Sequence, residues 1–364
     1  MAFYDKFLRP ELFTTGSTLF PVLLEAIGQA KEEILIAAYE LKNDATCGQF
    51  IKSLGDAAAR GVRVRVLFDN VELVSDSTEF IKNTLYSRGV AVCVFRPLRT
   101  WLPFHPLIAA CRNHARFVLI DKIIFGCGGM SFTDVSLTRN DIFLLCAIRM
   151  PPDALREYFE KLWALAEKSS VPEALAFKNT APICAGYTLL ASGPEKRDQE
   201  IYDWLDRMCD KARHAIVIGT PFFFPDTPLL HKLAVARSRG VHVEVITPLS
   251  TDKPRYDWFR AAPILWLVAR GVQWLGARAY FHSKFCIVDT QWTFGSANID
   301  IVGTQRNYEL NACGDDALIL QKLHGHAKEL TLHAVDIFRQ PMPRSVKLLI
   351  RIFHPLAEYI FKLT

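Results

Sequence analysis

Apolar and polar positions follow two alternating patterns along the first part of the chain. Residues 19–31 carry apolar side chains at helical spacing and lead into a strand-like run, E-I-L-I-A-A-Y, at 33–39. A second helix is expected over 46–60, before the alternating run V-R-V-R-V-L-F at 62–68. This order of elements predicts a βαβ unit with a short Arg-Gly break at the end of its helix.

The same succession returns in the second half of the chain. There the pattern predicts helices over 197–213 and 227–238, and strands at 215–221 and 239–246. The two copies lie about 170 to 180 residues apart, far more than the repeat of a solenoid, which indicates two homologous lobes. Because helices alternate with apolar strands, each lobe is expected to be α/β, with a mixed sheet flanked by helices.

Composition predicts the boundaries of the lobes. A stretch with three prolines and many polar residues separates the two sets of elements, and a segment of cations among large apolar residues follows the second set. The predicted domains are an N-terminal lobe at 1–170, a linker at 171–196, a C-terminal lobe at 197–340 and a basic amphipathic tail at 341–364.

Each predicted lobe contains one cluster of residues suited to phosphate chemistry. In the second lobe, His282 is followed two places later by Lys284, then by Asp289, the turn G-S-A-N at 295–298, and Glu309. Side chains at positions i and i+2 of a strand face the same way. His282 and Lys284 are therefore expected to point together at one reacting group.

The first lobe repeats this cluster. His114, Arg116, Asp121 and Asp141 take the corresponding places, and Ser131 lies near the turn. The histidine precedes one carboxylate by seven residues and the other by twenty-seven, and both intervals recur in the second lobe. Two copies imply two half-sites.

Two imidazoles and two cations suit the cleavage or transfer of a phosphodiester. One imidazole attacks phosphorus, the other protonates the leaving oxygen, and the cations stabilise the developing charge. Neither a metal nor a cofactor is expected, because these groups supply both the nucleophile and the acid.

The position of each residue in the cluster predicts its role. The candidate catalytic residues are His114, His282, Arg116 and Lys284, with Asp141 and Glu309 holding the imidazoles by their second nitrogens. Hydrogen bonds to the phosphate are expected from Ser131, Ser296 and Asn298. Asp121 and Asp289 are expected to be structural, since an extended strand carries them away from the histidines.

The duplicated pattern H-x-K-x4-D followed by G-S-x-N resembles the phospholipase D superfamily. Within it the chain is most similar to bacterial cardiolipin synthases, through R-G-V-R-V-R-V-L-F-D, F-R-P-L-R, T-P-F-F-F-P and G-S-A-N-I-D. The resemblance implies two similar lobes that share one active site at their interface. It also implies a phosphohistidine at His114 and a general acid, then base, at His282, although the near-symmetry leaves the reverse assignment open.

The first half-site departs from the family pattern at two positions. Arg116 stands where the family has lysine, and Ser131 where it usually has asparagine. Arginine keeps the charge but is longer and planar, and serine donates one hydrogen bond in place of two. We interpret this half-site as altered but not inactive.

Charge and amphipathic segments suggest an anionic membrane surface as a partner. The net charge is +5, and residues 96–110 place Trp101 and Phe104 among prolines and arginines. A packed loop is the alternative for 96–110, and a helix capping the second lobe is the alternative for the tail. No signal peptide and no run of about 18 apolar residues is found, so a peripheral position on the cytoplasmic side is expected.

Three functions compete on these residues. The first is a phosphatidyltransferase of the cardiolipin synthase type acting on phospholipid. The second is a hydrolase of the same superfamily, a phospholipase or a nuclease, although the chain lacks a basic cluster around stacking aromatics and nucleic acid is an improbable partner. The third is a lipid-binding homologue with an impaired site. The oligomeric state is not predicted.

Overall fold

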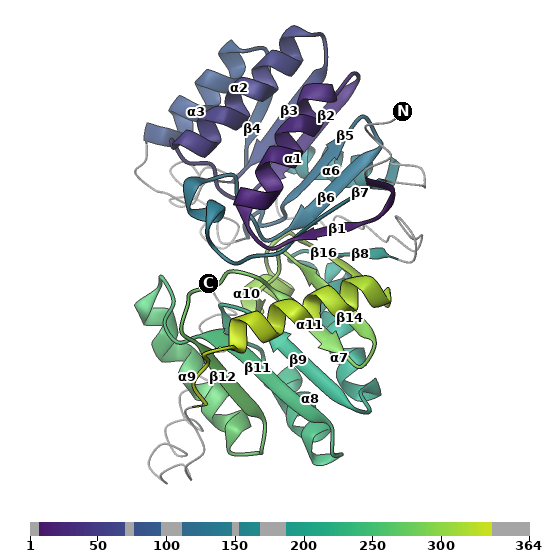
Figure 1. The fold of residues 1–364 in the computed structure, drawn as a ribbon, viewed down its shortest axis with the longest axis vertical. Helices are drawn as coiled ribbons and strands as arrows, with labels where there is room; N and C mark the ends of the chain where they lie inside the picture. Colours follow the sequence, from purple (N-terminus) through teal and green to yellow (C-terminus); the bar gives the residue numbers. More distant parts are fainter. Residues whose placement is uncertain (1–6, 70–75, 96–110, 148–152, 168–186, 337–364) are drawn as a thin grey trace.

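The computed structural model describes residues 7–69, 76–95, 111–147, 153–167 and 187–336, which form two lobes stacked end to end (Figure 1). The aromatic loop at 96–110 and the tail at 341–364 lie outside the described residues. Within the described part of the chain, no helix combines the length and apolar character needed to span a bilayer.

The N-terminal lobe is a seven-stranded mixed sheet with helices on its faces. Its elements are β1 (Glu11–Phe13), α1 (Gly16–Gln29), β2 (Glu33–Ala38), α2 (Ala45–Ala59), β3 (Arg63–Phe68), α3 (Asp76–Ser87), β4 (Ala91–Val94), β5 (Phe117–Ile120), β6 (Ile124–Gly128), the 3-10 helix η2 (Asp134–Leu137), β7 (Phe143–Ala147) and α6 (Asp153–Glu167).

The C-terminal lobe repeats this architecture. Its elements are β8 (Thr188–Ser192), the 3-10 helix η3 (Lys196–Asp198), α7 (Glu200–Lys211), β9 (Ala215–Gly219), β10 (Phe223–Phe224), α8 (Thr227–Ser238), β11 (His242–Pro248), α9 (Pro254–Val268), β12 (Gln273–Ala277), β13 (Phe285–Val288), β14 (Gln291–Gly295), β15 (Ile299–Asp300), α10 (Ile301–Gln305), β16 (Glu309–Gly314) and α11 (Ala317–Thr331).

The two sheets have the same strand order. The first runs β4-β3-β2-β5-β6-β7-β1 and the second β12-β11-β9-β13-β14-β16-β8. In each, three parallel strands are continued by four antiparallel ones. The prediction of two homologous α/β lobes with mixed sheets is therefore confirmed.

One predicted boundary is wrong. The predicted linker spans 171–196, yet β8 lies inside that range and pairs antiparallel with β16 as the edge strand of the second sheet. It corresponds to β1 of the first lobe, so the second lobe begins no later than Thr188. A five-residue strand with three apolar residues, beside a proline-rich stretch, is too short to stand out from the composition of a linker.

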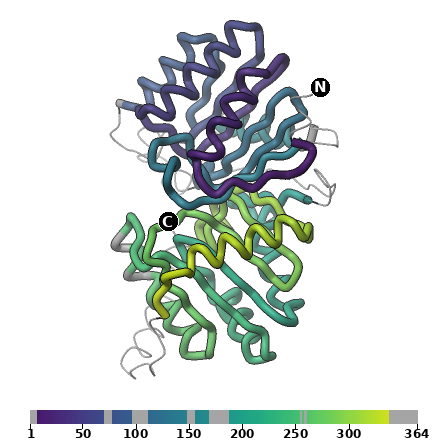
Figure 2. Tube along the Cα trace, in the orientation of Figure 1, coloured from purple at the N-terminus to yellow at the C-terminus, as the bar shows by residue number. Residues whose placement is uncertain are grey.

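A single apolar core joins the lobes. Alternate residues of β2 face opposite ways: Ile34 and Ile36 pack with α1 and α2, whereas Leu35 and Ala37 face a core that continues into the second lobe. Side chains of α6 and α11 fill this shared core. Figure 2 shows α11, in yellow, crossing the C-terminal lobe just below the seam.

Candidate active site

The two motif histidines meet where the lobes touch. His114 and His282 lie in the short segments that enter β5 and β13, and each is anchored by the backbone of the other lobe. The amide of His114 donates to the carbonyl of Tyr308 at 2.9 Å, and the amide of His282 donates to that of Asn140 at 2.7 Å. The motif residues therefore precede the strands instead of lying on them, because these segments bridge the seam before the regular pairing begins.

Each imidazole is held by a carboxylate of the opposite lobe. The Nδ1 atom of His114 lies 2.9 Å from Oε2 of Glu309, and that of His282 lies 2.8 Å from Oδ2 of Asp141. Both carboxylates are almost completely buried. The structure thus pairs each histidine with the carboxylate of the other copy, so that in each ring Nδ1 is held and Nε2 points away from the carboxylate.

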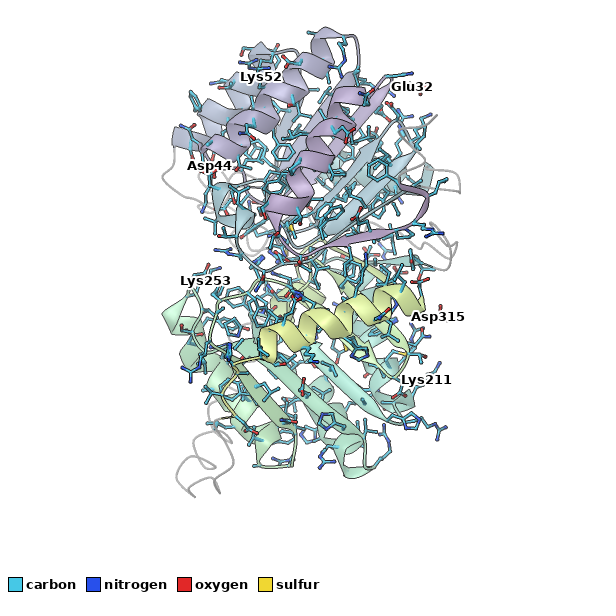
Figure 3. All side chains as sticks on the ribbon, in the orientation of Figure 1. Glu32, Asp44, Lys52, Lys211, Lys253 and Asp315 are labelled. Carbon is cyan, nitrogen blue, oxygen red and sulfur yellow. The ribbon has the colours of Figure 1, made fainter. Side chains whose placement is uncertain are left out.

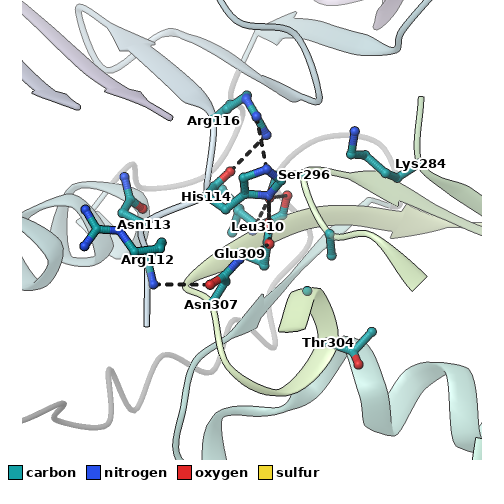
Figure 4. Close-up of polar contacts among 12 residues, drawn as sticks. Arg112, Asn113, His114, Arg116, Lys284, Ser296, Thr304, Asn307, Glu309 and Leu310 are labelled. Carbon is teal, nitrogen blue, oxygen red and sulfur yellow. Dashed lines mark hydrogen bonds and ion pairs between the residues drawn. The ribbon is translucent and has the colours of Figure 1, made fainter. Parts of the chain in front are cut away.

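Arg116 contacts the other face of His114 (Figure 4). Its guanidinium donates to Nε2 of His114 at 3.1 Å, to the carbonyl of the same residue at 3.2 Å, and to Oγ of Ser131 at 3.2 Å. Because guanidinium only donates, Nε2 accepts and the ring proton belongs on Nδ1, facing Glu309. This tautomer presents a lone pair on Nε2, which a nucleophile requires.

Burial shifts the ionisation of the site. It lowers the pKa of His114 well below its ordinary value, with Arg116 adding to the effect, and lowers that of His282 to about 3. Burial raises the pKa of Glu309 to about 8, against the opposing hydrogen bond from Ser296. Burial alone would also raise the pKa of Asp141, but His282 lowers it to about 2.

The second half-site holds the remaining candidates for phosphate binding. Lys284 is buried and donates to the carbonyl of His282, and burial lowers its pKa. Ser296 does not face the cavity as a phosphate donor, because its hydroxyl donates to Glu309 and accepts from the amide of Leu310 at 3.0 Å. Asn298 lines the cavity, and its Oδ1 is buried without a hydrogen-bond partner among the described residues.

The hairpins of the two motifs differ by one residue. Two residues connect β13 to β14, whereas three connect β5 to β6. Allowing for this insertion, Ser131 corresponds to Asn298, and Gly129 to Ser296. A Cβ atom at Gly129 would lie 2.3 Å from Oδ1 of Asp141, so this half-site has no room for the serine that supports the other carboxylate.

Asp121 and Asp289 lie away from the imidazoles and organise the lobes. Each begins the hairpin after its motif strand with a positive φ, 50° and 54°. Each carboxylate accepts hydrogen bonds from three backbone amides at the start of the neighbouring strand in the sheet, which is β2 for Asp121 and β9 for Asp289. They lock the order of the central strands, and through it the position of each histidine.

Tyr39 is a site residue that the motif analysis missed. It follows β2, packs edge-on against His114 with ring centres 4.5 Å apart, and lies 5.1 Å from the guanidinium of Arg116. The aromatic ring therefore supports the arginine that replaces the family lysine. No spacing in the sequence relates Tyr39 to the motif, because the contact exists only when β2 and β5 pair.

Tyr158 and His326, which occupy corresponding positions in the two lobes, were also missed by the motif analysis. Each lies seventeen residues after the carboxylate of its lobe, on α6 and α11, and each packs on the phenylalanine three residues after the motif histidine, with ring centres 5.7 and 5.9 Å apart. The hydroxyl of Tyr158 donates to the carbonyl of Glu309 at 3.2 Å. His326 Nε2 lies 3.0 Å from Oγ of Ser283, between His282 and Lys284. The equal interval of seventeen residues in both lobes is the sequence signal that could have identified this pair.

Replacing Tyr158 with phenylalanine is expected to lower kcat about fivefold to tenfold, since it removes one buried hydrogen bond to the backbone of Glu309. KM should change little, because the hydroxyl does not face the cavity. Steady-state kinetics with the Tyr86→Phe variant as the control checks this, since Tyr86 is 75% exposed. An unchanged kcat would remove Tyr158 from the positioning of Glu309.

The histidines open onto a cavity of about 570 Å³ between the lobes. Both lobes line it, and the residues that surround the reacting groups are Tyr39, Arg112, Arg116, Ser131, Arg139, Phe222, Lys253, Tyr256, Asn298 and Asp300. Within the described ranges, no three His, Cys, Asp or Glu side chains gather in a way that could hold a metal ion. Paired histidines and cations at the seam of two similar lobes define a two-lobed phosphoryl-transfer site.

The chain belongs to the family described as cardiolipin synthase, phospholipase D-like domain. The family model matches residues 23–163 and 205–331, one copy in each lobe. This agrees with the resemblance that the duplicated motif indicates.

Curated relatives and a solved structure are similar over most of the chain. Cardiolipin synthase from Oceanobacillus iheyensis is 29% identical, covering 88% of this chain and 68% of that protein. The major cardiolipin synthase ClsA of Bacillus subtilis is 28% identical with the same coverage. The crystal structure of phosphatidylserine synthase from Haemophilus influenzae shares the fold, with a TM-score of 0.72 at 15% identity, covering 97% of this chain and 95% of that one.

Proposed function

We propose that this protein is a phosphatidyltransferase of the cardiolipin synthase type, which transfers a phosphatidyl group from one phosphatidylglycerol to the hydroxyl of another. The crossed pairs His114–Glu309 and His282–Asp141 carry the proposal, because they hold two imidazoles by Nδ1 around one cavity. The similarity to cardiolipin synthases supports this choice of lipid.

The first step forms a phosphohistidine. Nε2 of His114 attacks phosphorus, the bond from phosphorus to the glycerol oxygen breaks, and His282 gives its Nε2 proton to that oxygen. Burial lowers the pKa of His282 and favours its neutral form, whereas the negative charge of a bound phosphodiester favours its protonated form. Arg116 and Lys284 stabilise the charge on the non-bridging oxygens, with hydrogen bonds from Ser131 and Asn298.

The second step reverses the roles. The hydroxyl oxygen of the acceptor attacks phosphorus, the bond from phosphorus to Nε2 of His114 breaks, and the hydroxyl proton passes to Nε2 of His282. Both histidines return to their starting state, so the cycle needs no further reactant. Water in place of the lipid alcohol would give phosphatidic acid by the same step.

We infer that the protein works from the surface of a membrane, on the cytoplasmic side. The lipid substrates of the reaction lie in a bilayer, and the net charge of +5 favours attraction to anionic lipid. The donor and acceptor then reach the cavity from the same surface.

Purified protein incubated in EDTA with phosphatidylglycerol vesicles labelled in the acyl chain tests the proposal. Labelled cardiolipin with release of glycerol is the expected result. Phosphatidic acid alone would contradict transfer and indicate a hydrolase. A lack of turnover, both of lipid and of single-stranded nucleic acid, would leave a lipid-binding role.

A further inference from the structure

The cavity contains more cations than one phosphodiester needs. Arg116 contacts the ring of His114 and Lys284 contacts the backbone carbonyl of His282, so the proposed function assigns these two to the reacting phosphate. Four other cations line the walls: Lys42, Arg112, Arg139 and Lys253.

Two of these four are already neutralised. Arg112 forms a buried ion pair with Asp69, and Lys42 lies 3.1 Å from Glu40. Their positive charge is therefore balanced within the protein, and they add little to the attraction of an anion.

Arg139 and Lys253 are held differently. The guanidinium of Arg139 lies 5.0 Å from the ring centre of Tyr280, and the ammonium of Lys253 lies 5.3 Å from that of Phe222. No carboxylate of the described residues lies within ion-pair distance of either cation. A cation over an aromatic ring keeps its outward N–H groups available for a ligand.

The two cations come from different lobes and line the same cavity. Arg139 packs on Tyr280, two residues before His282, and the hydroxyl of Tyr280 donates to Asp252 at 3.3 Å, next to Lys253. Figure 3 shows Lys253 at the edge of the C-terminal lobe that faces the seam. Asp252 also lines the cavity and lowers the local positive potential, so an anion there needs both cations.

We infer that Arg139 and Lys253 form a second anion subsite, which binds the phosphodiester that the acceptor alcohol itself carries. This inference rests on the proposed function and names the property by which the site selects its acceptor. One cation pair, Arg116 and Lys284, holds the phosphate that reacts, and the second holds a phosphate that does not. Water and neutral alcohols cannot use the second pair, so an anionic lipid alcohol is preferred.

A competition between two acceptors tests the subsite. Vesicles of acyl-labelled phosphatidylglycerol are incubated with ethanol at a fixed concentration, so that the same donor yields cardiolipin or phosphatidylethanol. In the Arg139→Gln and Lys253→Gln variants, we expect the ratio of cardiolipin to phosphatidylethanol to fall about tenfold, the loss expected for one charged hydrogen bond. The double variant should lower the ratio further.

The control removes the same charges elsewhere. Lys211 and Arg213 are exposed, and Figure 3 shows Lys211 well away from Lys253. Replacing both with glutamine should leave the ratio as in the wild type. If Arg139→Gln and Lys253→Gln lower both products in parallel, the cations attract the bilayer or the donor and the subsite is excluded; unchanged products exclude it as well. Failure of the proposed function is separate, because the wild type would then form no cardiolipin.

Discussion

Replacing His114 with alanine is expected to lower cardiolipin formation by about four orders of magnitude or more, because the reaction loses its nucleophile. The same change at His282 should have an effect of similar size, since the leaving oxygen then departs without a proton. Lipid analysis after incubation with labelled phosphatidylglycerol measures both. The His242→Ala variant is the control, because the side chain of His242, at the first residue of β11, is 56% exposed.

The two variants also identify the nucleophile. If His114 attacks phosphorus, the protein with His282→Ala should still acquire acyl-labelled phosphatidyl groups slowly, whereas the protein with His114→Ala should acquire none. Acid-labile label on the denatured protein is the measurement. Label on the His114→Ala variant alone would reverse the assignment.

The crossed carboxylates carry the second large effect. Glu309→Gln and Asp141→Asn are each expected to lower kcat about 10³-fold, because an amide keeps the hydrogen bond but no longer stabilises an imidazolium. The Asp141 carboxylate raises the pKa of His282, so its loss lowers that pKa further. The alkaline limb of the pH profile, where the acid loses its proton, should therefore move to lower pH in Asp141→Asn.

Nitrogen-15 spectra of the histidine side chains test the crossing itself. Glu309→Gln should change the ring signals of His114, and Asp141→Asn those of His282, although each pair joins different lobes. Lys52→Gln on the exposed face of α2 is the control for general effects of a surface substitution. Signals that change within one lobe instead would show that each histidine is held by its own copy.

The altered first half-site is explained by its surroundings. Arg116 occupies a position bounded by His114, Ser131 and the ring of Tyr39, which holds the planar guanidinium in place. Ser131 stands where the family usually has asparagine, and its hydroxyl accepts a hydrogen bond from Arg116. These contacts hold Arg116 beside His114, and the activity of this half-site stays a prediction.

Local sequence was sufficient to predict much of the fold and of the candidate site. The duplication, the α/β character of the lobes and the identity of both histidines, both cations and both late carboxylates followed from periodicity and from spacing. These features depend on residues a few places apart, or on an interval that recurs. The predicted helix over 227–238 has the bounds of α8, and the structure shows why: the Asp226 side chain caps its first turn, and Gly240, with a positive φ, follows its last residues.

Tertiary structure alone decided how the half-sites are combined. The bonds from His114 to Glu309 and from His282 to Asp141 join residues 195 and 141 positions apart, across a seam formed only when both lobes pack. The same packing brings Arg139 and Lys253 into one cavity. Spacing along a chain reports neighbours on one element, whereas contacts between elements depend on how their faces are buried. The sequence by itself therefore determined which groups are candidates for the chemistry, and the fold determined which of them contact each other.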